Sequence, residues 1–382
     1  MAHLRQHGLQ PQNIAIIPAA AGGPKGLILQ ALDQWLFGEW LPGAPRERSL
    51  IGASIGAWRM AAASHSDPVA AFQRLGDLYC GQSYPDRPDA HQVSTAVIEL
   101  LQNFIGGHER EILDQPLHHL HLITTRGRGL LHTPRNSASA KAGFALAGIA
   151  NLAGRPALAR HMERVIIGDA RDPLPWLKEK FDQFNTHFCA LTQDNLASAL
   201  LASGTLPLIM EPVRHIPQIP AGTYWDGGII DYHLALPYCR VKQNCGVNES
   251  SARYGDGDGD NKLEEKAENQ HGKQQELVLY PHFTDQIVPG WMDKPFPWRR
   301  AGRGANRHWV DNVIMVSPSP AFLRTLPRGK LPDRKDFAHH GTNHSARIRQ
   351  WKQAIAESAR LRDAFAAFVD RPDLAQVQPL NF

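Results

Sequence analysis

The stretch Gly52-Ala53-Ser54-Ile55-Gly56 reads G-x-S-x-G, and it lies between the apolar run Ser49-Leu50-Ile51 and a helix-like run at 57–63. Strand, sharp turn and helix are the setting of a nucleophile elbow, which exposes a serine hydroxyl on a strained turn. The glycines leave room where a larger residue would clash with the adjoining strand or helix. A helix start also offers free N–H groups to developing negative charge. The stretch therefore predicts a nucleophilic Ser54, with a plain Gly-rich turn and a capping serine as the alternative.

A second glycine-rich loop lies upstream. The apolar run 13–18 predicts a buried strand that opens into Ala21-Gly22-Gly23-Pro24-Lys25-Gly26, and residues 27–36 have the apolar spacing of a helix. The loop lacks the lysine position of a phosphate-binding P-loop and the three-glycine spacing of a dinucleotide turn. An oxyanion hole for acyl transfer fits better, with backbone N–H donors from Gly22 or Gly23 and from Ile55. A tight turn without a ligand is the alternative.

An aspartate ends a later apolar run, in Tyr224-Trp225-Asp226-Gly227-Gly228. Glycines at this place let the backbone pass close to a neighbouring element while the carboxylate points into a site. By itself, Asp-Gly-Gly is also a common turn. The carboxylate becomes a catalytic candidate because the two stretches above accompany it.

Together these stretches resemble the patatin-like phospholipase family. The resemblance rests on the loop at 21–26, the elbow at 52–56 and Asp226-Gly227-Gly228, and it extends from about residue 13 to about residue 240. Ala202-Ser203-Gly204-Thr205-Leu206-Pro207 is similar to the family's Ala-Ser-x-x-x-Pro segment. Two positions depart from the pattern: Ala21 replaces the first glycine of the loop, and Lys25 stands where arginine is usual. Lysine cannot make the planar bidentate contact of arginine, which leaves the role of this position open.

The resemblance implies an α/β fold of three layers, with a mainly parallel central sheet flanked by helices, and a Ser–Asp dyad. Ser54 would be the nucleophile, and Asp226 would accept its proton and return it to the leaving group. We expect a partly desolvated Asp226 and a short hydrogen bond between the two side chains. The oxyanion hole is expected to comprise Gly22, Gly23 and Ile55, and the supporting loop positions are Lys25, Gly26, Gly52, Gly56, Gly227 and Gly228.

The activity that the resemblance implies is the hydrolysis of carboxylic esters in phospholipids or related acyl lipids, of the phospholipase A or lysophospholipase type. A soluble esterase or acyltransferase with a Ser54–Asp226–His282 triad is one alternative, because these residues follow the chain order of α/β-hydrolases. It is weaker, since only one convincing strand precedes Ser54. A non-catalytic lipid-binding protein on the same fold is another alternative. The intact Ser54, Asp226, Gly22 and Gly23 argue against it.

The chain has 382 residues, of which 42% are hydrophobic, enough for a substantial core. Strand patterns alternate with helix patterns, which predicts a single α/β domain over residues 1–382. Residues 282–382 would form an extension packed on the core. Strands are expected near 13–18, 48–51, 117–124, 163–168, 222–226, 276–281 and 312–316. Helices are expected near 26–38, 57–64, 68–79, 90–103, 138–151, 194–203 and 344–369.

Composition bounds the remaining possibilities. The net charge of +4 gives no argument for a nucleic-acid partner. The sequence contains no apolar run long enough to span a membrane, and its start lacks an apolar signal segment. The cysteines show no paired framework, which indicates reduced thiols and a cytoplasmic protein. No cofactor and no metal ion are expected, and the oligomeric state stays open. These cysteines are Cys80, Cys189, Cys239 and Cys245.

The polar, Gly-rich segment 244–275 predicts a disordered surface insertion. Its run Asp256-Gly257-Asp258-Gly259-Asp260-Asn261 has carboxylates at alternate positions, as a calcium loop has. The match fails at two decisive positions, because Asn261 replaces the turn glycine and Ala267 replaces the glutamate at the twelfth position.

Two other clusters have alternative interpretations. His118-His119-Leu120-His121 could ligate a metal from one face of a strand, but no carboxylate stands at a helpful spacing, so a strand edge is favoured. The aromatic and basic stretch 291–309 suits a lipid–water interface and hence a peripheral membrane contact. A solvated loop with some buried tryptophans explains the same stretch.

Overall fold

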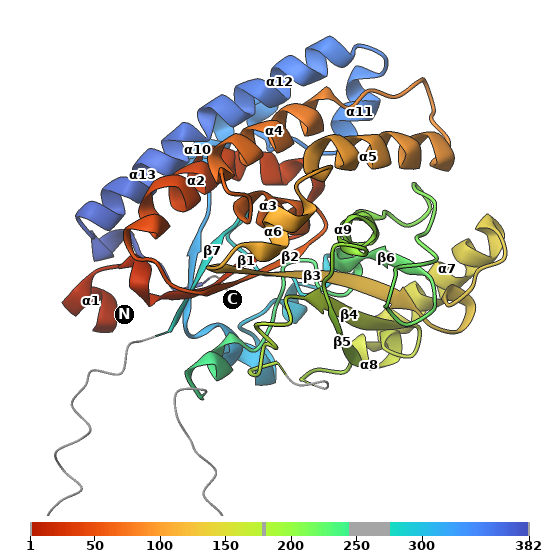
Figure 1. Ribbon diagram of the computed structural model, residues 1–382, viewed down its shortest axis with the longest axis horizontal. Coiled ribbons are helices and arrows are strands. Elements are labelled where there is room, and N and C mark those ends of the chain that lie inside the picture. The colour runs from red at the N-terminus through yellow and green to blue at the C-terminus, as the bar shows by residue number, and fades with distance from the viewer. Residues whose placement is uncertain (1, 178–180, 244–275, 381–382) are drawn as a thin grey trace, which may run out of the picture.

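A mostly parallel sheet runs through the centre of the computed structural model, which describes residues 2–177, 181–243 and 276–380 (Figure 1). Within these residues the strand order is β5-β4-β3-β2-β1-β7-β8, and β6 pairs with β3. The pairs β3–β4 and β3–β6 are antiparallel, and the others are parallel. The sheet expected from the sequence is confirmed. The strands are β1 (Ile14–Ala19), β2 (Arg48–Ala53), β3 (His118–Gly127), β4 (Met162–Gly168), β5 (Thr186–Ala190), β6 (Tyr224–Asp226), β7 (Leu277–Pro281) and β8 (Val313–Val316).

The helices flank this sheet, and several begin at a side-chain cap. The side chain of Asp89 accepts from the backbone of Gln92 and opens α5, and Asn136 opens α7 in the same way. The α-helices of the described residues are α1 (Ala2–His7), α2 (Gln30–Trp35), α3 (Ile55–Ala63), α4 (Pro68–Gly81), α5 (Ala90–Ile105), α6 (Glu109–Asp114), α7 (Ser137–Ala153), α8 (Arg155–Leu158), α9 (Leu196–Gly204), α10 (Pro320–Thr325), α11 (Lys335–His340), α12 (His344–Glu357) and α13 (Ala359–Asp370).

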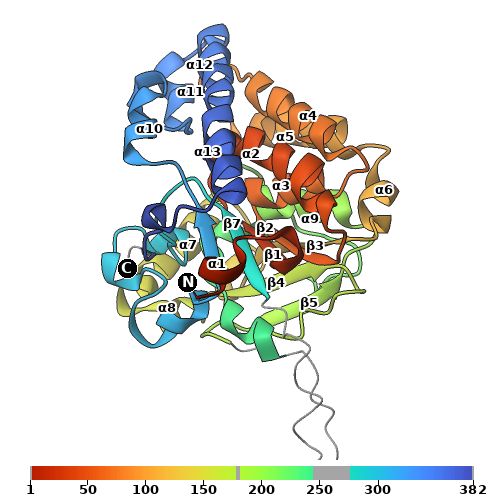
Figure 2. The ribbon, with the colours of Figure 1, turned by 90° about the vertical axis from the view of Figure 1, so that its left-hand side faces the viewer.

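Helix α3 lies between the sheet and the outer helices, and each of its residues is buried. On its far side lie α2, α4, α12 and α13, as Figure 1 and Figure 2 show. A separate apolar cluster packs α7 and α8 against β4 and β6. In that cluster the Phe144 ring meets Trp225 edge to face, with the centroids 5.0 Å apart. Because successive side chains of a strand point to opposite faces, Asp226 points away from α7 and toward α3.

The C-terminal part of the chain completes both the sheet and the helical layer. β7 pairs with β1 and β8 with β7, so the strand that precedes the glycine loop lies between β2 and a strand from late in the sequence. α12 packs on the 3-10 helix Gly23–Leu29, and α13 packs on α2 (Figure 2). The predicted insertion at 244–275 lies outside the described residues.

The secondary structure differs from the sequence prediction at several places. The short helices α1, α6, α8, α10 and α11 were not expected. β5 was not expected, because Thr-His-Phe-Cys-Ala is a short edge strand with exposed positions. The helix expected at 344–369 is two helices, which meet at the buried Ser358. Its hydroxyl donates to the carbonyl of Ile355 and accepts from the N–H of Ala31. The helix expected at 26–38 begins as the 3-10 helix Gly23–Leu29, continues as α2 and ends in a π-turn at Leu36–Trp40.

Candidate active site

Ser54 lies in the turn between β2 and α3. Its φ of 57° and ψ of −129° place it in a region that a non-glycine residue rarely adopts. The backbone on both sides is packed too closely for a side chain. A Cβ at Gly52 would lie 2.5 Å from the backbone of Ala57, and one at Gly56 would lie 2.0 Å from the carbonyl oxygen of Ala19. The strand, strained turn and helix that the G-x-S-x-G sequence predicts are therefore present.

Ser203 of α9 holds this turn from behind. The N–H of Ser54 donates to the Ser203 hydroxyl at 2.9 Å, and that hydroxyl donates to the carbonyl of Ile123 in β3 at 2.7 Å. Ser203 is fully buried. The sequence placed Ser203 in a family-like segment but gave no sign of this contact, because the three residues are far apart in the chain.

Asp226 ends β6 beside β3 and faces Ser54. The Ser54 hydroxyl donates to Oδ2 of Asp226 at 2.7 Å, and the N–H of Gly228 donates to Oδ1 at 2.6 Å. The backbone N–H of Asp226 donates to the carbonyl of Thr205. Both reacting side chains are buried. The structure thus brings together two side chains that are 172 positions apart in the sequence.

The environment of Asp226 makes its carboxylate more basic than an exposed one. Burial raises the pKa of Asp226 to about 6, against the opposing effects of the hydrogen bonds from Ser54 and Gly228 and of the charges of Arg334 and Lys294. A carboxylate with this pKa is still ionised at neutral pH, and it accepts a proton more readily than an ordinary aspartate does.

The glycine loop lies beside the dyad. Gly23 has a φ of 56°, and a Cβ at Gly22 would lie 2.5 Å from the ring of Phe283. Within the described residues, no protein acceptor is present for the N–H groups of Gly22, Gly23 and Ile55. These three groups are the donors that an oxyanion would need.

The supporting positions also lie where the sequence places them. Lys25 follows the loop with its Nζ 5.6 Å from the centre of the Phe283 ring, and burial lowers the pKa of this lysine. Gly26 packs against Ile55. Gly227 and Gly228 form the start of the 3-10 helix Gly227–Ile229, directly after the aspartate.

A cavity of about 450 Å³ opens at the dyad. Its volume is within the usual range of small-molecule sites. One part is apolar, and the rim near Ser54 carries positive side chains. Three of the rim residues come from the C-terminal part of the chain. Trp291 belongs to the aromatic stretch that the sequence singled out, whereas roles for Lys294 and Arg334 were not expected from the sequence. The apolar part is lined by Trp58, Val93, Val97, Leu206, Ile209 and Met210.

Residues 22–236 match the family model described as patatin-like phospholipase. The chain belongs to the patatin-like phospholipase family. Membership supports a hydrolase of lipid esters as the general activity, and it accounts for the loop, the elbow and the Asp-Gly-Gly motif. A comparison with the curated proteins found no match. Among the described helices of this patatin-like protein, none is both long and apolar enough to cross a bilayer.

His282 does not contact the dyad of this patatin-like site. It is fully buried, and its Nδ1 lies 2.6 Å from the carbonyl oxygen of Thr284. Burial lowers the pKa of His282 to about 3. The hydrogen bonds of the Ser54 hydroxyl and of the Asp226 carboxylate go to each other and to Gly228.

The histidines of β3 lie inside the sheet, because β3 pairs with β4 on one side and with β2, followed by β6, on the other. The strand-edge interpretation is therefore wrong. His119 Nδ1 lies 3.0 Å from Asp169, and His121 Nε2 lies 3.0 Å from Asp172. These carboxylates follow β4, so local sequence spacing could not reveal them.

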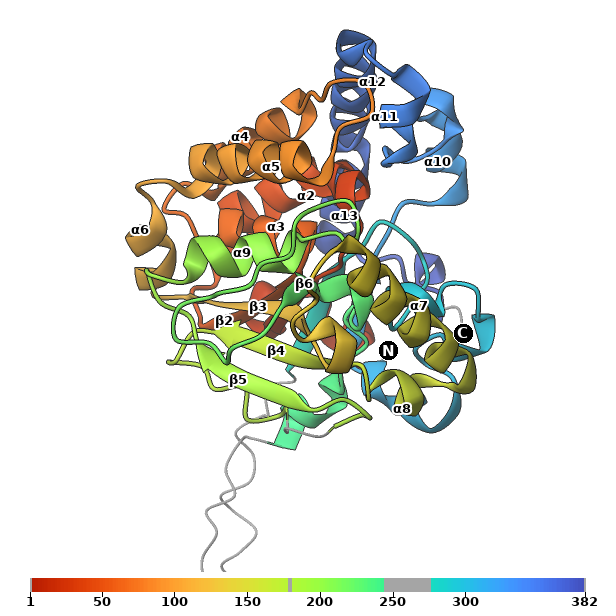
Figure 3. The same cartoon turned by 90° about the vertical axis from the view of Figure 1, so that its right-hand side faces the viewer.

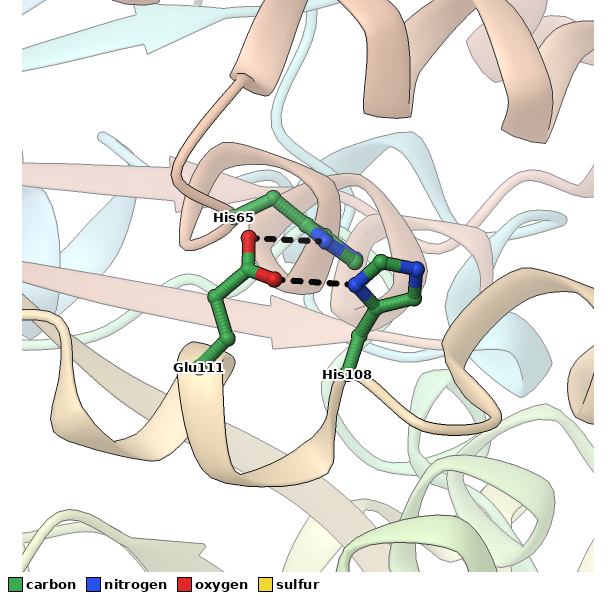
Figure 4. Close-up of side chains that lie close together, drawn as sticks. All are labelled: His65, His108 and Glu111. Carbon is green, nitrogen blue, oxygen red and sulfur yellow. Dashed lines mark hydrogen bonds and ion pairs between the residues drawn. The ribbon is translucent and has the colours of Figure 1, made fainter.

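Figure 4 shows a second cluster, in which His65 and His108 face the two oxygens of Glu111. His108 Nδ1 lies 2.9 Å from one oxygen, and His65 Nδ1 lies 3.5 Å from the other. These three groups are close enough to hold a metal ion. However, the guanidinium of Arg74 lies 3.3 Å from His108 and 3.4 Å from His65, and Ser66 donates twice to Glu111. A neighbouring cation disfavours a second one, and hydrogen bonds explain the cluster.

The aromatic and basic stretch at 291–309 divides into two kinds of residue. Trp298 is exposed, whereas Trp309 is buried. Arg299 pairs with the buried Asp293 at 3.0 Å, and Arg300 donates to three backbone carbonyls. Contacts within the protein therefore already engage Arg299 and Arg300, two of the arginines that the sequence analysis assigned to a lipid surface.

Proposed function

We propose that this patatin-like protein hydrolyses the carboxylic esters of acyl lipids through an acyl-Ser54 intermediate. The observation that supports the proposal most directly is the 2.7 Å hydrogen bond from the Ser54 hydroxyl to Asp226 at the base of the cavity. The raised pKa of Asp226 and the strained turn at Ser54 both suit a nucleophile and its base.

In the proposed reaction, the oxygen of the Ser54 hydroxyl attacks the ester carbonyl carbon. At the same time, Asp226 accepts the proton of that hydroxyl. The oxyanion that forms accepts hydrogen bonds from the N–H groups of Gly22, Gly23 and Ile55. The carbon–oxygen bond to the alcohol then breaks, and the alcohol leaves with the proton from Asp226. Water attacks the acyl-Ser54 ester and gives a proton to Asp226. The tetrahedral intermediate that results then breaks down. The bond to the serine oxygen breaks, the fatty acid is released, and Asp226 returns the proton to the serine oxygen.

The test of this proposal is labelling and hydrolysis with matched serine variants. A fluorophosphonate probe should react at Ser54, and Ser54→Ala should abolish both labelling and the release of fatty acid from a mixed phospholipid substrate. Ser198→Ala, a half-buried serine of α9 outside the cavity, serves as the control and should keep both. Labelling at another serine, or full activity in Ser54→Ala, would refute the proposal.

A histidine variant distinguishes the dyad from the triad. His282→Asn keeps a polar group beside Thr284 and removes the imidazole. Since His282 does not contact Ser54 or Asp226, this variant should retain most of the rate. A loss as large as that of Ser54→Ala would assign the proton acceptor to His282.

We further propose a peripheral membrane contact through α7. Figure 3 shows α7 on the outside of the molecule. This helix carries one charged residue, Lys141, and three of its apolar side chains are exposed: Leu146, Ile149 and Leu152. A helix that is apolar all round normally has an apolar environment on both sides.

A lipid surface is the occupant that we propose for the exposed α7 face, because the buried face of the same helix contacts the segment that contributes Trp291 to the cavity rim. The side chain of Asn151 in α7 donates to the carbonyl of Met292 at 3.1 Å, next to the rim residue Trp291. The exposed Trp298 follows in the same segment. Contact of α7 with a membrane would thus bring the rim segment at 291–298 close to the lipid.

The single-domain organisation and the cytoplasmic location are part of the same proposal. β7 and β8 belong to the sheet of the N-terminal strands, and the rim of the cavity includes Lys294 and Arg334. These contacts support one domain over residues 1–382. The thiols of Cys80 and Cys189 form no disulfide, which suits a reducing compartment.

A further inference from the structure

Three cations meet at the rim of the cavity beside the dyad: Lys25 from the glycine loop, and Lys294 and Arg334 from the C-terminal part of the chain. Lys294 and Arg334 lie outside residues 22–236, which match the family model. Any role of these two side chains therefore belongs to this chain rather than to the matched family segment.

Aromatic rings hold the two C-terminal cations near each other. Lys294 Nζ lies 3.8 Å from the centre of the Tyr232 ring and 5.8 Å from that of Trp291. The guanidinium carbon of Arg334 lies 6.0 Å from the centre of the same Trp291 ring. The Arg334 side chain also runs beside the glycine loop, because its Cγ is 3.9 Å from the place of a Cβ on Gly23. Both positive groups thus flank the place where an ester bond would lie.

Within the described residues, none of the three cations forms an ion pair with a carboxylate. The two acidic groups nearby are already engaged. Asp333 pairs with Lys330 at 3.0 Å, and Asp226 accepts from Ser54 and Gly228. Two buried arginines of this protein do pair with carboxylates: Arg59 with Asp33, and Arg164 with Asp231.

Lys25 and Lys294 are half-buried, and Arg334 is exposed. Bringing positive groups together at such a rim is unfavourable unless a negative group joins them. The effect is visible at Lys294, where burial first and the charges of Lys25 and Arg334 second lower the pKa to about 7. The pKa of Lys25 is also lowered, mainly by burial. An anion between these groups would reverse both effects and hold the lysines in their charged form.

We propose that Lys294 and Arg334, with Lys25, bind the anionic headgroup of the substrate, so that the enzyme prefers acyl esters of anionic amphiphiles over zwitterionic or neutral ones. The chemistry recognised is a phosphate or phosphonate oxyanion placed a few bonds from the ester. This inference rests on the proposed function, because it assigns the headgroup end of the same cavity whose apolar part takes the acyl chain.

The first experiment compares three substrates that share a palmitoyl chain: lysophosphatidylglycerol, lysophosphatidylcholine and monopalmitoylglycerol, each in neutral detergent micelles at low salt. Wild-type kcat/KM should favour the anionic ester by at least about tenfold, as expected for a partly buried charge contact. Lys294→Met and Arg334→Met should each remove most of this preference, because kcat/KM should fall much more for the anionic ester than for the neutral one. Arg324→Met is the matched control, since Arg324 is exposed in the same part of the chain and lies outside the cavity.

The second experiment measures binding without hydrolysis. Dodecylphosphonate and inorganic phosphate are titrated into the Ser54→Ala variant by calorimetry, with and without Lys294→Met. The phosphonate should bind, and its affinity should fall about tenfold when Lys294 is replaced. Inorganic phosphate that binds as tightly as the phosphonate would overturn the assignment to a lipid headgroup and indicate a site for free phosphate.

The two experiments separate the headgroup proposal from the proposed function. Equal hydrolysis of all three esters, unchanged by Lys294→Met, would overturn the headgroup proposal and leave the lipid hydrolase intact. No hydrolysis of any ester, together with phosphonate binding that depends on Lys294, would overturn the proposed function and uphold the anion site.

Discussion

Asp226 sets the pH dependence of the proposed reaction. Because burial raises its pKa to about 6, the carboxyl is protonated below that pH and cannot accept the Ser54 proton. We therefore expect kcat/KM for a neutral soluble ester to fall as the pH drops through about 6. The charge of Arg334 lowers this pKa, so in Arg334→Met the same acid limb should move to higher pH.

Two results of the pH profile would contradict the assignment of Asp226 as the base. An acid limb near pH 4 would mean that Asp226 titrates like an exposed aspartate and is not the base in a desolvated site. A limb that disappears in His282→Asn would identify a histidine as the titrating group.

Ser203 is expected to act as a positioning residue. In Ser203→Ala, the N–H of Ser54 and the carbonyl of Ile123 lose their shared partner, and both are buried. The free energy of unfolding should fall by about 1–3 kcal/mol. The turn should also lose its fixed geometry, so kcat should fall more than KM rises, and fluorophosphonate labelling of Ser54 should slow. Ser198→Ala, in the same helix, should change neither the free energy of unfolding nor the kinetics and labelling of Ser54. Equal effects from both serine variants would mean that Ser203 contributes only to packing.

Local sequence motifs predicted those site residues that can be recognised from the residues next to them in the chain. Ser54 and Asp226 are recognisable because glycines flank them, and those glycines are required by the close backbone packing seen at Gly52 and Gly56. Lys294 and Arg334 could not be found in this way. Their importance depends on the fold that brings them to the cavity rim, and nothing in their own segments distinguishes them from surface lysines and arginines.

At the scale of elements, the ion pair between α2 and α3 is the clearest case of packing that depends on a buried charge. Arg59 of α3 donates to both oxygens of Asp33 in α2, at 2.7 and 2.8 Å. Both side chains are almost completely buried. Asp33→Ala would leave a buried guanidinium without its partner, so the free energy of unfolding should fall by about 3–5 kcal/mol.

Chemical denaturation followed by circular dichroism measures this loss. Glu276→Gln is the comparison, because Glu276 pairs with Arg46 near the surface and its removal should cost less than about 1 kcal/mol. Similar small losses in the two variants would show that α2 and α3 hold together without the ion pair.

Elements with long, regular apolar patterns were predictable, and short or composite ones were not. β1 is a continuous apolar run, and β4 contains the apolar run 165–167, as is typical of strands covered on both faces. β5 contains alternating exposed residues at a sheet edge, so its sequence lacks that signal. The local sequence could not predict the break between α12 and α13 at Ser358, because Ser358 accepts a hydrogen bond there from the N–H of Ala31 in α2.

At the scale of the whole molecule, the apolar face of α7 should decide how the protein meets a membrane. A variant with Ile149→Ser and Leu152→Ser removes two side chains that are 64% and 67% exposed. Binding to anionic vesicles in a sedimentation assay should weaken by about tenfold or more, because less apolar surface enters the lipid. Hydrolysis of a soluble ester should stay the same, since neither residue lines the cavity.

The control for α7 is a second pair of exposed apolar residues on other helices, Val69→Ser and Ile98→Ser. This pair should leave vesicle binding unchanged. If both double variants bind vesicles as the wild type does, the α7 face is not a membrane contact.

The position of β1 between β2 and β7 has a consequence for the synthesis of this protein. A ribosome adds about 5–20 residues per second, so roughly 5–20 s separate the appearance of Asp226 from that of Arg334. During this time the growing chain already contains its serine and its aspartate. For the first part of the interval it lacks both β7 beside β1 and the Phe283 ring that packs against Gly22, and Arg334 is the last of these groups to appear. The nascent chain is therefore expected to remain inactive toward lipids until its last third has left the ribosome.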